Sequence, residues 1–219
     1  MLRLAPRAWH GARFFCALLP VWGLSAASAA DPGSAPGPGP VTSLLEMRQE
    51  GVVIQKWDLS CGAAALATVL TYQHDDPVPE KEIAKSLISR DKYLEDLDIL
   101  RAQRGFSLLD LKRYVDTRGY KGIGYKDLEL EDLIRLAPIM VPIVNHGYDH
   151  FVVFRGVHGD RVLLADPAWG NRTMRVERFS QVWLNHPRLG RVGFIVARED
   201  GPAPPNRLAA RSSDFVMLR

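Results

Sequence analysis

Helix-forming segments fill the first half of the chain, and β-branched runs follow in the second half. The segments expected to be helices are rich in Ala, Leu and charged helix formers: 61–72, 80–89, 107–117 and 129–136. Ser107 and Asp110 resemble a capping box at the start of the third. The runs expected to be strands are rich in Val, Ile and aromatic residues: 139–144, 151–157, 161–165, 172–177 and 192–197, with a helical turn over 179–184. Helices followed by hairpin-linked strands predict an α+β fold with an antiparallel sheet.

The N-terminus has the pattern of a secretory signal peptide. Three Arg residues precede an apolar run over 14–24, and small residues follow over 25–30. The alternative is a membrane anchor, but this run of about eleven residues is well short of the roughly 20 that a spanning helix needs. We therefore expect a signal peptide over 1–30, an exported and periplasmic protein, and no stable membrane span after cleavage.

Composition divides the rest of the chain into three parts. Residues 31–40 form a Pro/Gly linker that has no means of building a core. The folded domain is expected over 41–199. The last part, 200–219, is rich in Pro, Ser, Ala and Arg and is expected to be a mobile tail, although the apolar run 215–218 has the character of a docking segment.

Net charge and cysteine content both change when the signal peptide is removed. Arg3, Arg7 and Arg13 account for the whole formal charge of +3, because the remaining 25 basic residues equal the 25 acidic residues. A neutral chain without a basic patch gives no support to nucleic-acid binding. Cys16 is also lost, which leaves Cys61 as a single thiol without an internal disulfide partner. No spaced set of metal ligands appears, and we expect no metal and no cofactor.

Cys61 lies where a loop ends and a helix is expected to begin. The helix dipole and the unpaired N–H groups at such a position favour the nucleophilic thiolate. The alternative is a buried structural thiol. Gln55 lies six residues upstream, where its side-chain amide can donate one hydrogen bond to an oxyanion while a backbone N–H at the helix start donates the other.

The base and its orienting acid are expected on a hairpin. His150 immediately precedes the strand 151–157, and Asp166 closes the strand 161–165. Pairing about a turn at 158–160 places position 150 opposite, or nearly opposite, position 166, so that the carboxylate can hold the imidazole in one tautomer. The alternatives are a half-buried histidine at a strand end and a turn-starting Asp. His74, among acidic neighbours, is expected in a surface loop, and His146 in a looser loop position.

These residues together resemble the papain-like peptidases that process bacteriocins at double-glycine leaders. The resemblance rests on Gln55, on Cys61 with its Ala-rich helix, on the run from His150 to Val153 and on the run from Asp166 to Ala168, in family order. It implies a papain-like fold with a catalytic helix packed on a C-terminal sheet, a triad of Cys61, His150 and Asp166, and an oxyanion role for Gln55. Ser60 departs from the family, in which Asp often precedes the Cys. The expected export of a stand-alone domain also departs, since the bacteriocin enzymes are usually fused to ABC transporters.

A closer resemblance is to the exported stand-alone members of functional-amyloid (Fap) secretion and biofilm operons. It rests on the runs 57–62, 155–157, 163–167 and 170–173. It implies a periplasmic cysteine endopeptidase whose partner is a secreted protein or peptide, with an amyloid subunit or export component as candidates. The alternatives are a non-catalytic peptide-binding or chaperone module of the same system, and a transglutaminase-like acyl transferase.

Overall fold

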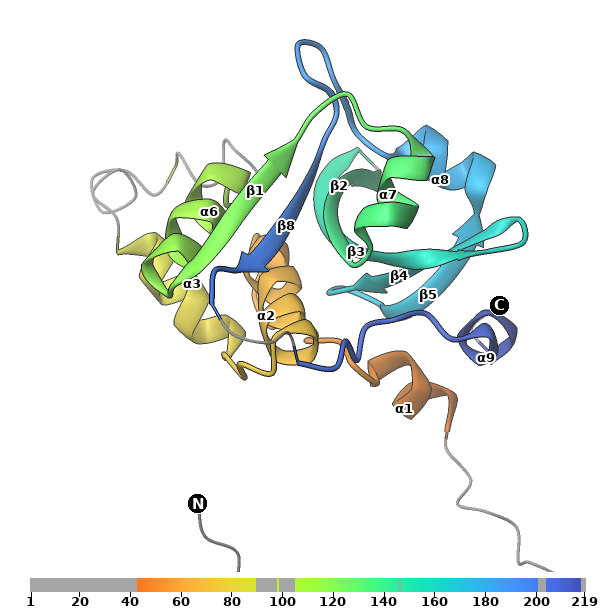
Figure 1. Cartoon of the computed structure of the whole chain (residues 1–219), viewed down its shortest axis with the longest axis horizontal. Coiled ribbons are helices and arrows are strands. Elements are labelled where there is room, and N and C mark those ends of the chain that lie inside the picture. Colours follow the sequence, from red (N-terminus) through yellow and green to blue (C-terminus); the bar gives the residue numbers. More distant parts are fainter. Residues whose placement is uncertain (1–42, 90–97, 99–104, 146, 201–203, 218–219) are drawn as a thin grey trace, which may run out of the picture. The chain divides into compact units, whose positions relative to one another are not determined.

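The computed structural model describes residues 43–89, 98, 105–145, 147–200 and 204–217 (Figure 1). The compact unit that contains them runs from Val41 to Arg219. The signal peptide and linker predictions, and His146, fall outside the described residues.

Helices precede most of the strands along the chain, as the sequence predicts. The helices are α1 (Leu44–Gln49), α2 (Cys61–Gln73), α3 (Glu80–Ile88), α6 (Leu108–Thr117), α7 (Leu130–Leu136), α8 (Val176–Val182) and α9 (Ser212–Met217). The strands are β1 (Tyr120–Tyr125), β2 (Ile139–Asn145), β3 (Tyr148–His158), β4 (Arg161–Asp166), β5 (Gly170–Arg175), β6 (Asn185–His186), β7 (Gly190–Arg191) and β8 (Gly193–Arg198). The expected capping box is present, because the Ser107 and Asp110 side chains each accept a hydrogen bond from the other's backbone N–H. None of the helices in the described ranges is long and apolar enough to span a bilayer.

A six-stranded sheet organises the domain in the order β1-β8-β2-β3-β4-β5, and every neighbouring pair is antiparallel. This arrangement confirms the predicted α+β class. The edge strand β1 was not expected, since glycines interrupt its sequence. Gly122 is needed there, because a Cβ atom at this position would come within 2.9 Å of the Phe194 and Val115 side chains.

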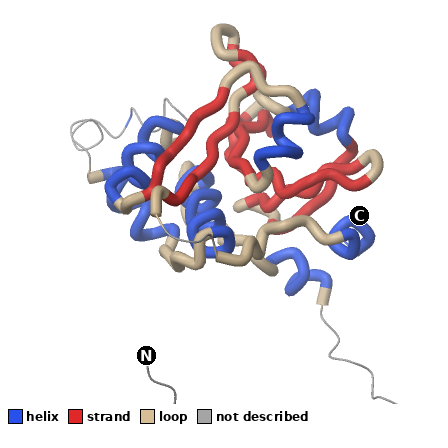
Figure 2. The backbone as a smooth tube through the Cα atoms, viewed as in Figure 1, coloured by secondary structure: helices blue, strands red, loops and turns tan. Residues whose placement is uncertain are grey.

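Helices cover both faces of the sheet (Figure 2). One apolar cluster joins α2, α3 and α6 to side chains such as Met140, Val153 and Phe194. A second cluster, on the opposite face, joins α7 and α8 to residues such as Val152 and Leu164. Alternate strand residues therefore enter different clusters, as the two-residue period of a strand requires.

The helix α2 is the central element of the first cluster. All ten residues from Cys61 to Leu70 are buried. Its side chains are small or apolar on every side, and a helix of that kind is stable only when it is surrounded. The Gly62 Cα approaches the Phe151 ring of β3 so closely that an added Cβ would lie 3.3 Å from it. The first turn of α2 is thereby fixed against the start of β3.

The structure corrects two of the expectations. His74 is buried, not in a surface loop, because its Nε2 atom lies 3.0 Å from the Val196 carbonyl under β8. The expected mobile tail is instead folded against the domain over residues 204–217, with Leu208 and Phe215 buried. The reason is a long-range contact, since the buried Arg155 Nε of β3 donates a hydrogen bond to the Leu208 carbonyl.

Candidate active site

The loop before α2 presents Cys61 as the first residue of the helix. Leu59 has a φ of 65°, a left-handed conformation that costs energy for a side chain of this type. Ser60 makes no side-chain capping bond to α2. Its hydroxyl lies instead 2.6 Å from the Trp57 carbonyl and contacts the Glu80 carboxylate. The first backbone N–H groups of α2 are thus left uncapped by Ser60 beside the Cys61 thiol, where they are able to bind a negatively charged oxygen.

His150 and Asp166 are brought into direct contact. The His150 Nε2 atom lies 2.7 Å from Asp166 Oδ1, and the Asp166 side chain is fully buried. The Ala168 N–H donates to the same Oδ1 at 2.9 Å, and the Arg172 guanidinium lies 2.8 Å from Oδ2 as an ion pair. The carboxylate is therefore held from several sides, and it fixes which ring nitrogen of His150 faces it.

This environment changes the protonation of both groups. Burial acts to lower the pKa of His150, but the hydrogen bonds to Asp166 and to the Cys61 thiol outweigh it and raise the pKa to about 9. Burial acts to raise the pKa of Asp166, and its hydrogen bond to His150 and the nearby Arg172 more than reverse this, so that its pKa is lowered. A protonated imidazole between a thiol and a carboxylate is the state that stabilises a thiolate nucleophile.

A pH titration is expected to show this shift directly. If the protonated imidazole is needed for activity, kcat/KM for peptide cleavage will fall on the alkaline side near pH 9, not near the ordinary value of 6.5. The same bonds stabilise the fold fully below pH 6.5, and this contribution is lost as the pH rises through about 9. The measurement is kcat/KM between pH 5 and 11. An alkaline limb near pH 6.5 would contradict the assignment.

Gln55 is tied to both halves of the site. Its backbone N–H donates to the Pro167 carbonyl at 2.9 Å, immediately after Asp166. Its side-chain amide donates to the Trp57 carbonyl at 3.3 Å, across the loop that leads to Cys61. That bond leaves the second amide hydrogen of Gln55 for a further acceptor. The four predicted residues therefore lie in two adjoining segments, the loop 55–61 and the ends of β3 and β4.

Glu80 is a part of this arrangement that the sequence did not indicate. The carboxylate is buried at the start of α3, where it contacts the Ser60 hydroxyl and accepts a hydrogen bond from the Lys56 N–H at 3.1 Å. Ser60 stands where the family resemblance expects Asp, and Glu80 supplies a carboxylate next to it. No local sequence signal marks Glu80, because its partners lie 20 and 24 residues away. Arg172 was missed for a similar reason, since only the pairing of β4 with β5 brings it to Asp166.

Replacing Glu80 by Gln is expected to loosen the loop that carries Cys61. The amide has the same shape but lacks the charge, and it gives the Lys56 N–H and the buried Ser60 hydroxyl a weaker acceptor. We expect a loss of about 1–3 kcal/mol in the free energy of unfolding and a fall of about tenfold in kcat. Urea unfolding and peptide-cleavage kinetics measure the two effects. The matched control is Glu82→Gln on the exposed side of α3, whose contact with Arg118 is a surface ion pair and is worth less than about 1 kcal/mol. Equal effects of the two substitutions would contradict this role.

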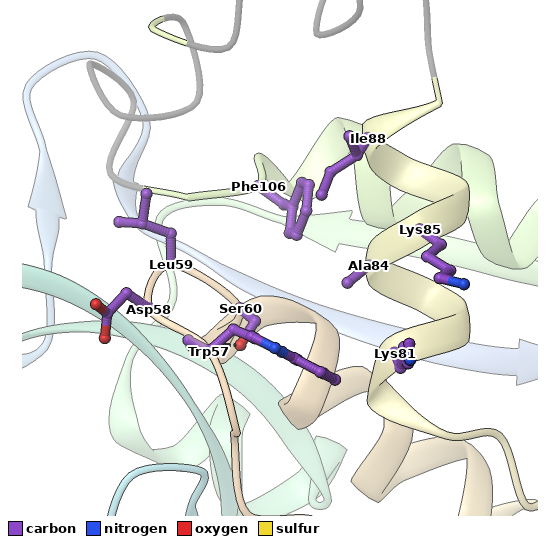
Figure 3. A pocket seen from close by; sticks show the side chains of 9 residues that line it. All are labelled: Trp57, Asp58, Leu59, Ser60, Lys81, Ala84, Lys85, Ile88 and Phe106. Atoms are coloured by element: carbon purple, nitrogen blue, oxygen red, sulfur yellow. Dashed lines mark hydrogen bonds between the residues drawn. The ribbon is translucent and has the colours of Figure 1, made fainter.

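A mostly apolar cavity of about 300 Å³ lies beside the nucleophile loop (Figure 3). The loop residues Trp57 to Ser60 form one wall, and α3 forms the opposite wall through Ala84 and Ile88. Figure 3 shows the Trp57 indole directed toward α3 and the Asp58 carboxylate directed away from the cavity. Lys81 and Lys85 also line it. A cavity of this character suits an apolar side chain.

Across the residues that the structure describes, no group of three or more His, Cys, Asp or Glu side chains is arranged to hold a metal ion.

A thiol at the start of a helix, with an imidazole and a carboxylate on a later hairpin, is an arrangement typical of cysteine peptidases. The chain belongs to the peptidase C39 family, whose sequence pattern matches residues 49–186. Two curated relatives carry the name "Probable functional amyloid protease FapD". The one from Pseudomonas fluorescens is 37% identical over 164 residues, which are 75% of this chain and 70% of the relative. The one from Pseudomonas aeruginosa is 38% identical over 144 residues. These residues are 65% of this chain and 61% of that relative, so the chain spans somewhat less than two thirds of its length.

Solved structures share the fold. The crystal structure of a double glycine motif protease from an AMS/PCAT transporter, in complex with the leader peptide, has a TM-score of 0.52 and 24% identity. It covers 67% of this chain and 90% of its own. The peptidase domain of Streptococcus ComA has a TM-score of 0.53 and 17% identity, and covers 68% and 98% respectively. The predicted papain-like fold and the resemblance to double-glycine and functional-amyloid peptidases are therefore confirmed.

Proposed function

We propose that the chain is a thiol endopeptidase that acts in the periplasm on a secreted protein, with Cys61, His150 and Asp166 as its catalytic triad. The observation that carries the proposal is the contact of 2.7 Å between His150 and the buried Asp166, and the influence of Cys61 on the raised pKa of His150 supports it. Membership of a peptidase family supports the reaction class.

The geometry accounts for each step of peptide hydrolysis. The Cys61 thiolate attacks the scissile carbonyl carbon, while the Gln55 amide and a backbone N–H at the start of α2 stabilise the oxyanion. The C–N bond breaks, and the protonated His150 gives its proton to the leaving amine. His150 then removes a proton from water, which attacks the thioester. The product carboxylate leaves, and the thiolate and imidazolium are restored.

The substrate is proposed to be a protein exported by the functional-amyloid pathway, either an amyloid subunit or an export component. The names of the two Pseudomonas relatives support this substrate class. The apolar cavity beside the loop that leads to Cys61 supports a substrate with an apolar side chain near its cleavage site. Double-glycine specificity is not part of the proposal, because the solved structures with that activity support only the fold.

The periplasmic location rests on the export signal expected over residues 1–30. Cell fractionation tests the location and the processing together. A C-terminally tagged chain is expected in the periplasmic fraction with a mass that fits loss of the signal. Cells that lack the chain are expected to accumulate an uncleaved secreted protein. Adding back the wild-type chain should restore cleavage of that protein, and adding back the Cys61→Ala variant should not. A tagged chain found in the cytoplasm, or equal cleavage with the wild-type chain and the variant, would contradict the proposal.

A further inference from the structure

The strand β3 contains a bulge between the turn of the β3–β4 hairpin and His150. On the turn side Gly156 pairs with Leu163, and beyond the bulge Phe154 pairs with Leu164, so Arg155 is the extra residue. The packing shows the same change of phase. Phe154 and Val157 both contact the cluster beneath α7 and α8, although they are separated by an odd number of positions. The extra residue thus changes which side chains share a face of the sheet. Even-numbered residues on the N-terminal side of Arg155 share a face with odd-numbered residues on its C-terminal side.

This change of phase decides whether His150 and Asp166 lie on one face. Without the bulge, the pairing at Gly156 would continue to place Val153 opposite Asp166, and His150 would point to the other face. With the bulge, the pairing of Val153 with Ala165 continues to place Val152 opposite Asp166. His150 is then one diagonal step away on the same face, which is within reach of a histidine ring. The 2.7 Å contact of the two side chains depends on the extra residue.

Arg155 is anchored by buried partners far from it in sequence. It is 5% exposed. Its Nε donates to the Leu208 carbonyl at 2.9 Å, and one terminal nitrogen donates to Asn171 Oδ1 at 2.6 Å. The other terminal nitrogen lies 3.5 Å from the Ala209 carbonyl and 3.5 Å from Asp214. A planar guanidinium whose three nitrogens are each held by a partner fixes the orientation of its own backbone.

The C-terminal segment 204–217 is the other half of this clamp. Leu208 is fully buried, and Asp214 is 8% exposed. The residue after Arg155 also faces the segment, since a Cβ on Gly156 would lie 3.0 Å from the Ala210 side chain. Both bulge residues thus contact the same segment. Asn171 extends the clamp to the N-terminal part, because its amide donates to the Glu50 carbonyl at 2.6 Å.

We propose that Arg155, clamped by the C-terminal segment 204–217, is a positioning residue that holds the β3 bulge and thereby keeps His150 on the face of Asp166. The proposal rests on the proposed function for its catalytic consequence only. Its structural part, the control of the His150 environment by a residue that does not touch it, stands or falls by itself.

An NMR titration of the His150 ring protons tests the proposal without any substrate. In Arg155→Gln the bulge loses its clamp, and we expect the pKa of His150 to fall from about 9 toward the ordinary 6.5. The matched control is Arg161→Gln, an arginine of β4 on the turn side of the bulge that binds Thr173. It is expected to leave the His150 pKa unchanged. An unchanged pKa in folded Arg155→Gln would overturn the proposal, as would an equal shift in the control.

A milder variant tests the proposal even if Arg155→Gln does not fold. Asp214→Asn weakens one of the two longest contacts of Arg155, at 3.5 Å, and the ion pair of Asp214 with Arg211 in the same segment. It is expected to shift the His150 pKa in the same direction by a smaller amount. If Arg155→Gln does not fold, an unchanged pKa in Asp214→Asn overturns the proposal. With a cleavable peptide, kcat of Arg155→Gln should fall by about 10- to 100-fold with KM unchanged. A pKa shift in a chain that cleaves nothing would support the positioning role and contradict the proposed function.

Discussion

Cys61→Ser is expected to lower kcat for peptide hydrolysis by about 10⁴-fold or more. The hydroxyl is a much weaker nucleophile than a thiolate at neutral pH, and the imidazole of a cysteine peptidase is tuned to pair with sulfur. Removal of the nucleophile alone abolishes nearly all the catalysis of a triad that works as a unit. The measurement is the initial rate of cleavage of a fluorogenic peptide that spans the mapped cleavage site.

The chain offers a matched control for this substitution. Cys16 is the other of its two cysteines and lies in the expected signal peptide. Cys16→Ser is therefore expected to leave the rate of the exported protein unchanged. A Cys61→Ser protein that retained more than about a tenth of the wild-type rate would show that the thiol is structural, because loss of a true nucleophile is far larger.

Asp166→Asn is expected to lower kcat by about 10³- to 10⁴-fold with little change in KM. An amide has nearly the same shape and its oxygen still accepts a hydrogen bond, but it lacks the negative charge that stabilises the imidazolium. The pKa of His150 should fall from about 9 toward 6.5 in the same variant, because Asp166 supplies the first of the bonds that raise it. Kinetics and a pH profile measure the two effects.

Asp160→Asn is the control for this second substitution. Asp160 lies at the turn of the same hairpin, and its side chain is 62% exposed, 4.0 Å from Arg175. A surface pair of this kind contributes little, so both kcat and the pH profile are expected to match the wild type. Loss of activity in Asp166→Asn with an unchanged pH profile would contradict the role of the carboxylate in holding the imidazole charged.

Short-range sequence patterns were enough to predict most of the fold. The capping box at Ser107 was visible because its partner is three residues away. The β3–β4 hairpin was visible because Gly159 lies at its turn between two β-branched runs. The edge strand β1 was not, since Gly122 is present to admit the Phe194 ring of another strand.

The contacts that complete the site could not be predicted, because they also join residues that are far apart in the sequence. The bulge at Arg155 depends on Leu208, 53 residues later, and no pattern within β3 announces an extra residue. Glu80 and His74 are buried among partners that only the folded chain brings near them. The sequence thus predicted which residues make up the candidate site, whereas the groups that hold them in place depend on tertiary contacts.

We propose that Cys61 of this chain cleaves a secreted protein. The most direct measurement is mass-spectrometric mapping of fragments after the wild-type chain and Cys61→Ala are incubated in parallel with the exported proteins encoded beside it. We expect discrete new termini with the wild-type chain and none with the variant. Crosslinked products would indicate acyl transfer instead. Tight binding of an exported protein by both chains, without new fragments from either, would contradict the claim and identify a binding module.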